Sequence, residues 1–302
     1  MAEADRSDPK STRGPGGPPV SAVAGGTSGT VSPAGQVSYS DYLQIPELLS
    51  LQRCLTQPTA HDELQFIVVH QVYELWFKLV LHELDAVHAA LAIGDDTALA
   101  TALRLLRRVN AIFAVLVAQI HVLESMRPVD FLAFRGRLKP ASGFQSAQFR
   151  ELESLLGLKD EALLARLGDD PRRAAVAARH AGDTLPAALY RTLARRGFEV
   201  VLPGPQRSAE EQQRSLLALR RIYERPDAHS PLYETCEALV DLDEQLVLWR
   251  RHHVMMVERQ IGTKPGTGQG VTGELDGIRY LTTTLSRRAL PDLWAVRSLL
   301  PD

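Results

Sequence analysis

The sequence is short of several features that define whole classes of protein. Of its 302 residues only Cys54 and Cys236 are cysteine, and they form neither a CxxC motif nor a spacing typical of metal ligands. This excludes a zinc ribbon, a disulfide-stapled scaffold and a haem attached covalently through CxxCH. So few cysteines are typical of proteins in a reducing compartment, and we expect a cytoplasmic location.

An excess of charge is also missing. The formal net charge is -2, and basic and acidic residues are interleaved apart from short clusters such as RLLRR at 104–108. Binding to nucleic acid would need a concentrated basic face. The sequence has no uncharged apolar run of about eighteen residues, and its N-terminus lacks the apolar segment of a signal peptide. We therefore expect neither nucleic acid nor a membrane as a partner.

The first 37 residues differ from the rest of the chain. They contain seven glycines, five prolines and no aromatic residue. Such a segment cannot bury enough apolar area to offset the conformational entropy that ordering would cost. We predict a disordered tail over residues 1–37 and one folded domain over residues 38–302.

From Tyr39 onward, apolar residues recur at the three- and four-residue spacing of helices. The first long helix should start at Thr59 or His61–Asp62 and end at Gly94. Because each long helix is amphipathic, the long helices must pack on one another, and we predict an all-α helical bundle. Long helices are predicted over 58–94, 95–126 and 230–262, and shorter ones over 145–158, 160–180, 184–197, 208–226, 276–289 and 291–300.

One face of the first long helix combines a histidine with aromatic residues. Phe66, His70, Tyr73 and Phe77 recur at steps of three and four, so their side chains share that face. A histidine in this setting is either a core residue with a local hydrogen-bond partner or a functional imidazole in a dry pocket. The stretch by itself leaves both interpretations open.

A second histidine lies on an apolar stripe of the last long helix. In WRRHHVMMVERQIG, His253 shares a face with Trp249, Met256 and Val257, whereas His252 points toward a different face. A neutral imidazole among apolar side chains is what a haem iron takes as its axial ligand. The ordinary alternative is a histidine packed in the core beside a methionine and tryptophan stripe.

Two further stretches could bind a ligand. In FLAFRGRLKPASGFQS, Arg135 follows closely on Phe131, and a shielded guanidinium can pair bidentately with a carboxylate. The alternative is a surface arginine that lies over aromatic rings. The glycine-dense loop GTKPGTGQGVTGELDG, residues 262–277, contains Thr267 and Thr272 but matches no phosphate-binding fingerprint. This loop is either a lid over a ligand or a flexible connector.

Five stretches, in order along the chain, resemble the tryptophan 2,3-dioxygenase family, whose members use haem to open the indole ring. They are YSDYLQIPELLSLQ, HDELQFIVVHQVYELWFK, RPVDFLAFRGRLKPASGFQSAQFRELE, YETCEALVDLDEQLVLWRRHHVMMVERQIGTKPGTG and PDLWAVRSLL. The resemblance covers Tyr39 to Leu300 and leaves out only the tail. It implies a single all-α, haem-binding catalytic domain over residues 38–302, assembled as a homotetramer built from two dimers.

The resemblance also implies roles around a haem. His253 closes the family's W-R-x-x-H segment and would be the axial ligand of a non-covalently bound haem b. His70 closes its F-I-x-x-H motif and would be the distal histidine that meets the indole N–H. Phe66 and Phe131 correspond to aromatic walls of the pocket. Arg135 corresponds to the arginine that pairs with the substrate carboxylate.

Contacts to the rest of the substrate follow from the same resemblance. Thr267 or Thr272 corresponds to the threonine that meets the substrate ammonium group, depending on whether one counts forward from the axial histidine or back from the next helix. Tyr39, Tyr42 and Leu43 correspond to a segment that reaches into the site of a neighbouring subunit.

The reaction implied by the family is 2,3-dioxygenation of L-tryptophan to N-formylkynurenine, with dioxygen as co-substrate, as in tryptophan catabolism through the kynurenine pathway. The loop over residues 262–277 runs longer than is usual in the family. Because this loop would cover the amino-acid end of the substrate, a second reaction stays open. That alternative is a haem-dependent monooxygenase that converts a substituted tryptophan, such as β-methyl tryptophan, to a 2-oxindole.

Overall fold

The structure is a computed structural model, and the residues it describes are 37–139, 145–161, 164, 167, 171–204, 206–262, 264 and 281–301. The predicted tail, Thr267, Thr272 and most of the glycine-dense loop lie outside the described residues. Every regular element in the described part is a helix. The predicted all-α fold is therefore confirmed.

The chain divides into two compact units, residues 1–51 and residues 52–302. The described helices of the first unit are α1 (Tyr39–Leu43) and α2 (Ile45–Leu48). Gln44 separates them in a left-handed conformation with a φ of 51°. The predicted boundary between tail and folded domain stays a prediction.

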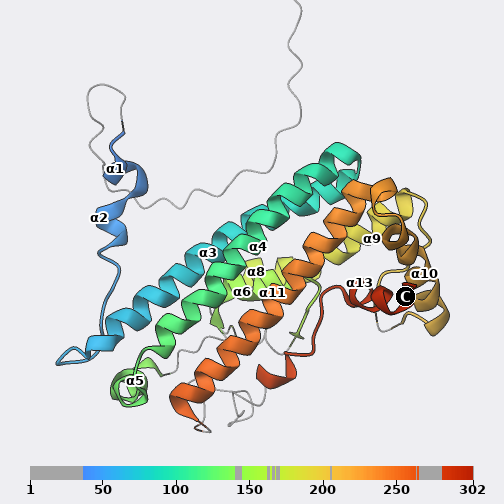
Figure 1. The fold of residues 1–302 in the computed structure, drawn as a ribbon. Helices are drawn as coiled ribbons and strands as arrows, with labels where there is room; N and C mark the ends of the chain where they lie inside the picture. Colours follow the sequence, from blue (N-terminus) through green and yellow to red (C-terminus); the bar gives the residue numbers. More distant parts are fainter. Residues whose placement is uncertain are drawn as a thin grey trace, which may run out of the picture. The chain divides into compact units, whose positions relative to one another are not determined.

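Three long helices form the centre of the second unit: α3 (His61–Ile93), α4 (Asp96–Glu124) and α11 (Ser230–Ile261). α4 packs against both α3 and α11, and the three run side by side in Figure 1. Their buried side chains, such as Leu84 and Leu106, belong to one hydrophobic core. The prediction that the long helices pack on one another is confirmed.

The start of α3 depends on an inward-facing carboxylate rather than on a side-chain cap. The helix begins at His61 with no side-chain cap, so Thr59 does not cap it. Glu63, in the first turn, is buried and accepts hydrogen bonds from the N–H groups of Leu55 and Thr56 and from the Thr56 hydroxyl. The carboxylate thus fastens the preceding segment to the helix.

A tight turn joins α3 to α4. Gly94 ends α3 with a φ of 75°, and a Cβ on it would lie 2.9 Å from both Thr192 Cγ2 and Arg195 Nη2. Both the backbone conformation and the close approach require glycine. Asp95 then begins α4, because its Oδ1 accepts the N–H of Ala98 at 2.8 Å. The predicted end of the first long helix at Gly94 is confirmed.

The helices α3 and α4 are long and apolar enough to cross a membrane by length and composition alone. Both supply buried side chains to the hydrophobic core. Because core helices of globular proteins pass the same test, this is weak evidence for a membrane span.

Shorter helices lie around the three long ones. The helix α5 contacts α3 and α11, while α6 and α9 each pack on α3. Their bounds are α5 (Pro128–Arg135), α6 (Ala147–Leu155), α8 (Arg173–Ala181), α9 (Leu185–Arg195), α10 (Ala209–Glu224) and α13 (Pro291–Ala295), with 3-10 turns at Gly136–Leu138, Asp227–His229 and Val296–Leu299. The short helices predicted over 145–158, 184–197 and 208–226 are confirmed.

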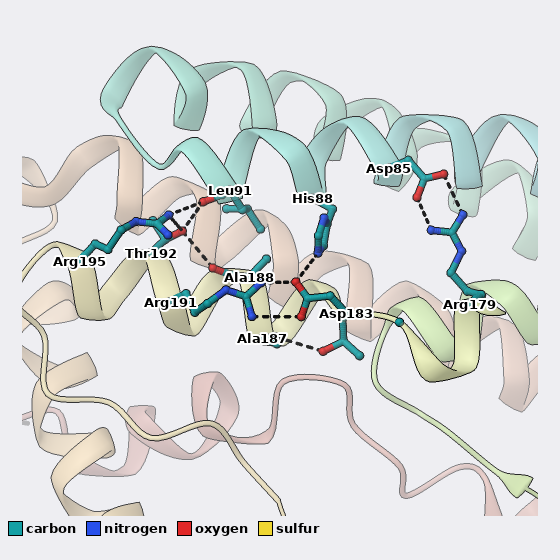
Figure 2. A network of polar contacts seen from close by, with 12 residues as sticks. Asp85, His88, Leu91, Arg179, Asp183, Ala187, Ala188, Arg191, Thr192 and Arg195 are labelled. Carbon is teal, nitrogen blue, oxygen red and sulfur yellow. Dashed lines mark hydrogen bonds and ion pairs between the residues drawn. The ribbon is translucent and has the colours of Figure 1, made fainter. Parts of the chain in front are cut away.

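Polar contacts fasten α8 and α9 to the C-terminal half of α3 (Figure 2). Asp183 comes just before α9, and its Oδ2 lies 2.9 Å from Nε2 of His88 on α3. The same carboxylate accepts hydrogen bonds from Arg191. Arg179 on α8 donates to the carboxylate of Asp85 on α3. These ion pairs join elements that are roughly a hundred positions apart in the chain.

Candidate functional site

His70 is half-buried on α3, and its Nδ1 lies 2.7 Å from the backbone carbonyl oxygen of Phe66. Because a carbonyl oxygen only accepts, Nδ1 carries the proton in this contact, which leaves the Nε2 lone pair as an acceptor. Burial lowers the pKa of His70, while the Phe66 carbonyl and the charge of Glu74 oppose that shift. The imidazole is therefore neutral near pH 7.

An aromatic wall lies beside His70. The centroid of the Phe66 ring lies 4.0 Å from the His70 ring, and the rings of Phe131 and Phe134 on α5 lie 5.7 Å and 5.6 Å from that of Phe66. The structure thus brings the predicted residues Phe66 and Phe131 together. Phe134 is fully buried and was not among the predicted residues. Its three-residue spacing from Phe131 is the signal that could have found it.

Arg135 is half-buried at the last position of α5, directly after Phe134. The helix that carries it packs against both α3 and α11. A partly shielded guanidinium next to an aromatic wall is suited to a carboxylate, since desolvation strengthens a charge-assisted pair. Its role toward a substrate stays a prediction.

His253 on α11 stacks on Trp249, one turn earlier. The ring centroids lie 5.2 Å apart and the planes differ by 12°. The pKa of His253 is lowered to about 4, mainly by burial, with the charges of His70 and Arg150 as further causes. Burial thus lowers the pKa of both imidazoles, that of His70 on α3 and that of His253 on α11.

His252, the neighbour of His253, contacts a different part of the fold. Its ring lies 5.6 Å from that of His121 on α4, with the two planes perpendicular. The Nδ1 of His121 in turn lies 2.8 Å from Glu124 Oε2. The two consecutive histidines therefore diverge, as the helical spacing predicts.

Rings from two further helices enclose Trp249. The ring of Phe149 on α6 lies 4.7 Å from it, and the rings of Tyr73 and Phe77 on α3 each lie 6.2 Å from it with their planes nearly perpendicular to the indole. α3, α6 and α11 thus meet in one aromatic cluster next to His253. Sequence reasoning placed Tyr73 and Phe77 on the same face as His70 but did not connect that face to Trp249.

A buried ionic group joins α6 to α11 close to the same cluster. Glu153 accepts from Arg150 at 2.6 Å and from Arg250 at 2.7 Å, and all three side chains are at least nine-tenths buried. Two guanidinium groups share one carboxylate, and the charge of Arg150 is one of the causes that lower the pKa of His253. Residue spacing carried no signal for this group, because Glu153 and Arg250 are 97 positions apart.

Glu74 connects α6 to α3 one turn after His70. Its carboxylate accepts from the hydroxyl of Ser146 at 2.6 Å and from Nε2 of Gln148 at 2.7 Å. The start of α6 is therefore held against the helix that carries His70. Glu74 shares the helix face of His70, but its partners could not be read from residue spacing.

The remaining predicted residues divide into two groups. Tyr39, Tyr42 and Leu43 lie on α1 in the first unit and are 78%, 76% and 42% exposed. An aromatic surface of this kind is available for another subunit. Thr267 and Thr272 lie outside the described residues, so the contact with an ammonium group stays a prediction.

The region around His70 and His253 is suited to a flat apolar group that carries one hydrogen-bond donor. Aromatic rings offer stacking and edge contacts to such a group, and Nε2 of His70 offers the acceptor that its buried donor would need. The lowered pKa of His253 leaves a neutral imidazole with a lone pair available to a metal.

Comparison with known proteins adds an independent finding. A family profile described as tryptophan 2,3-dioxygenase matches residues 24–170 and 186–300. The tryptophan 2,3-dioxygenase of Anaeromyxobacter dehalogenans is 48% identical over 271 residues, which cover 87% of this chain and 96% of the relative. That of Nocardioides sp. is 44% identical over 268 residues, covering 88% and 95%. That of Caulobacter vibrioides is 40% identical over 285 residues, covering 88% and 100%.

The matched ranges contain His70, Arg135 and His253 together with the helices that carry them. Both the extent of the profile match and the identity to relatives covered over nearly their whole length confirm the resemblance seen in the sequence motifs. The chain belongs to the tryptophan 2,3-dioxygenase family.

Proposed function

We propose that this chain is a haem-dependent dioxygenase that converts L-tryptophan to N-formylkynurenine. Its membership of the family supports this, as do the names of its relatives. The observation that carries the proposal is the setting of two imidazoles on different helices, with His70 beside the Phe66 ring and His253 stacked on the Trp249 indole.

The residues of this chain fit the haem that the family implies. A haem iron needs one neutral imidazole from the protein, and the pKa of His253, lowered to about 4, keeps that ring neutral. Among the described residues no three histidine, cysteine, aspartate or glutamate side chains gather as a metal site. A single imidazole from the protein would be enough for an iron that a porphyrin already holds. His253 would hold the haem, which supplies the activation of dioxygen when bound.

The other side chains would position the substrate. Nε2 of His70 would accept the hydrogen bond of the indole N–H, since Nδ1 is occupied by the Phe66 carbonyl. Phe66 and Phe131 would contact the indole faces and exclude water. Arg135 would pair with the carboxylate, and Thr267 or Thr272 would meet the ammonium group. Catalysis by the protein would then consist mainly of holding the indole C2–C3 bond in a reactive geometry.

The 2-oxindole alternative gains no support from the comparisons. The three relatives described above are all named as dioxygenases of tryptophan. The reason for the alternative was the long loop over residues 262–277, which lies almost entirely outside the described residues. The dioxygenase reaction is therefore the one proposed.

A homotetramer of two dimers is part of the same proposal. In it, Tyr39, Tyr42 and Leu43 of each chain would complete a neighbouring subunit's site, which suits their exposure on α1. The cytoplasmic location expected from the two cysteines also belongs to the proposal.

Haem binding and turnover together test this function. The wild-type chain, loaded with haem, should show a Soret band and consume L-tryptophan, and His253→Ala should lose both. His252→Ala is the matched control, because the adjacent ring packs against His121 instead, and it should keep both. A Soret band that is unchanged in His253→Ala but lost in His252→Ala would overturn the ligand assignment.

A further inference from the structure

The packing around His253 limits how its imidazole ring can rotate. The torsion between Cβ and the ring of a histidine is broad, so the side chain alone does not select one plane. In this structure the imidazole lies nearly parallel to the indole of Trp249, at 12° and 5.2 Å between centroids. Rotating the imidazole would turn its edge into the indole face, so the indole limits that rotation.

Trp249 is itself held by neighbours from other helices. The Phe149 ring on α6 lies 4.7 Å from the indole, and the rings of Tyr73 and Phe77 on α3 stand nearly perpendicular to it, at 74° and 81°. Tyr73 is fixed in turn, because its hydroxyl donates to the carbonyl oxygen of Leu116 on α4 at 2.9 Å. The packing of α3, α4 and α6 therefore determines the plane of the indole.

The indole nitrogen of Trp249 lies beside the phenol of Tyr73. Trp249 Nε1 is buried, and it is close enough to the Tyr73 hydroxyl to lower the pKa of that phenol, against the larger effect of burial, which raises it. The approach of Tyr73 is therefore a second way in which α3 holds the indole in place.

We propose that Trp249 is a positioning residue for the axial histidine, and that its indole plane sets the orientation of the His253 imidazole over the haem. This inference rests on the proposed function, because it takes His253 as the iron ligand. Neighbours of a metal ligand commonly fix the orientation of its ring and tune the metal. The orientation of an axial imidazole alters its overlap with the iron orbitals. It is therefore observable in the g values of the ferric haem and in the iron–histidine stretching frequency of the ferrous haem.

The test uses the full-length, haem-loaded protein with Trp249→Leu and Trp249→Phe. Trp249→Leu should shift both signals and release haem roughly three- to tenfold faster, because it loses a stacked ring pair. Trp249→Phe keeps an aromatic plane and should fall between wild type and Trp249→Leu. Trp76→Leu and Trp76→Phe are matched controls. Trp76 on α3 is also a partly buried tryptophan packed against the hydrophobic core, but among the described residues it is not one of the rings in contact with Trp249 or His253. Both controls should keep the wild-type signals.

Wild-type g values and an unchanged iron–histidine frequency in both Trp249 variants would overturn the inference, whatever their melting temperatures. If Trp249→Leu fails to retain haem, Trp249→Phe decides the question by the same two signals. His253→Ala is measured alongside. A haem spectrum that survives unchanged in His253→Ala removes the assignment of His253 as the iron ligand, on which the proposed function relies. If His253→Ala loses the haem spectrum while both Trp249 variants keep the wild-type g values and iron–histidine frequency, only the positioning role of Trp249 is wrong.

Discussion

At the scale of single residues, the surroundings of His70 and His253 give the same side chain two different tasks. Burial lowers the pKa of both rings. His70 is fixed by a carbonyl oxygen of its own helix and keeps Nε2 as an acceptor beside the Phe66 ring. His253 is fixed instead by a parallel indole, which leaves its lone pair for a metal. In the proposed function, the neighbour of each ring would decide whether that ring binds substrate or iron.

Arg135→Leu should reduce kcat/KM for L-tryptophan roughly a hundredfold or more, mainly through KM, with haem content unchanged. The physical reason is that the substrate carboxylate would be left in a shielded site without its charge-assisted partner. Arg137→Leu is the matched control, because Arg137 lies two residues later and is exposed. Steady-state kinetics and the Soret absorbance measure the two effects. A loss below about threefold would mean that the carboxylate binds elsewhere.

Residue spacing predicted the surroundings of the histidines only in part. Helical periodicity placed His70 and His253 on apolar faces. It could not assign the two histidines to one site, and that prediction came from the family motifs. Phe134 was within reach of the same spacing argument. The contacts of Glu74 with Ser146, about seventy positions away, depend on how helices pack and left no trace in the local pattern.

At the scale of helices, the apolar pattern predicted the three long elements well because they span many turns and end at clear signals. The burial of Glu63 was not predicted, because an acidic residue in the first turn of a helix is usually interpreted as a favourable surface charge. The polar contacts that join α9 to α3 were missed for a different reason. They pair residues such as His88 and Asp183, which are 95 positions apart.

One of these contacts predicts a pH dependence of stability. Hydrogen bonds from Arg191, and then from His88, lower the pKa of Asp183 from 3.8 to about 2. The unfolded chain therefore takes up a proton at Asp183 before the folded chain does. This stabilisation is present above the unfolded pKa and is lost as the pH falls from about 4 toward 2. Because the side chain is more than a third exposed, the contribution is at most about 1 kcal/mol.

Asp183→Asn should therefore lower the melting temperature by a few degrees at pH 6 and by less at pH 3, as followed by circular dichroism. Asp227→Asn, in an exposed 3-10 turn, controls for the change in net charge. An equal loss of melting temperature at both pH values in Asp183→Asn would contradict a contribution from its carboxylate.

At the scale of the whole molecule, we expect the N-terminal region to consist of a part that is dispensable for activity and a part that activity requires. Removing residues 1–37 should leave activity intact, because it deletes only the glycine- and proline-rich segment. Removing residues 1–48 should abolish activity, because it deletes α1 with Tyr39, Tyr42 and Leu43. Turnover of L-tryptophan and the oligomeric mass by light scattering are measured for both. Equal activity of the two shortened chains would contradict a role for α1 in a neighbouring site.

The number of oxygen atoms from dioxygen that enter the product tests the proposed reaction most directly. The haem-loaded protein is incubated with L-tryptophan under ¹⁸O₂, and the product is analysed by mass spectrometry, with His253→Ala as the negative control. The account predicts N-formylkynurenine that carries two ¹⁸O atoms and no product from the variant. A product that carries one ¹⁸O atom, or full turnover by His253→Ala, would contradict it.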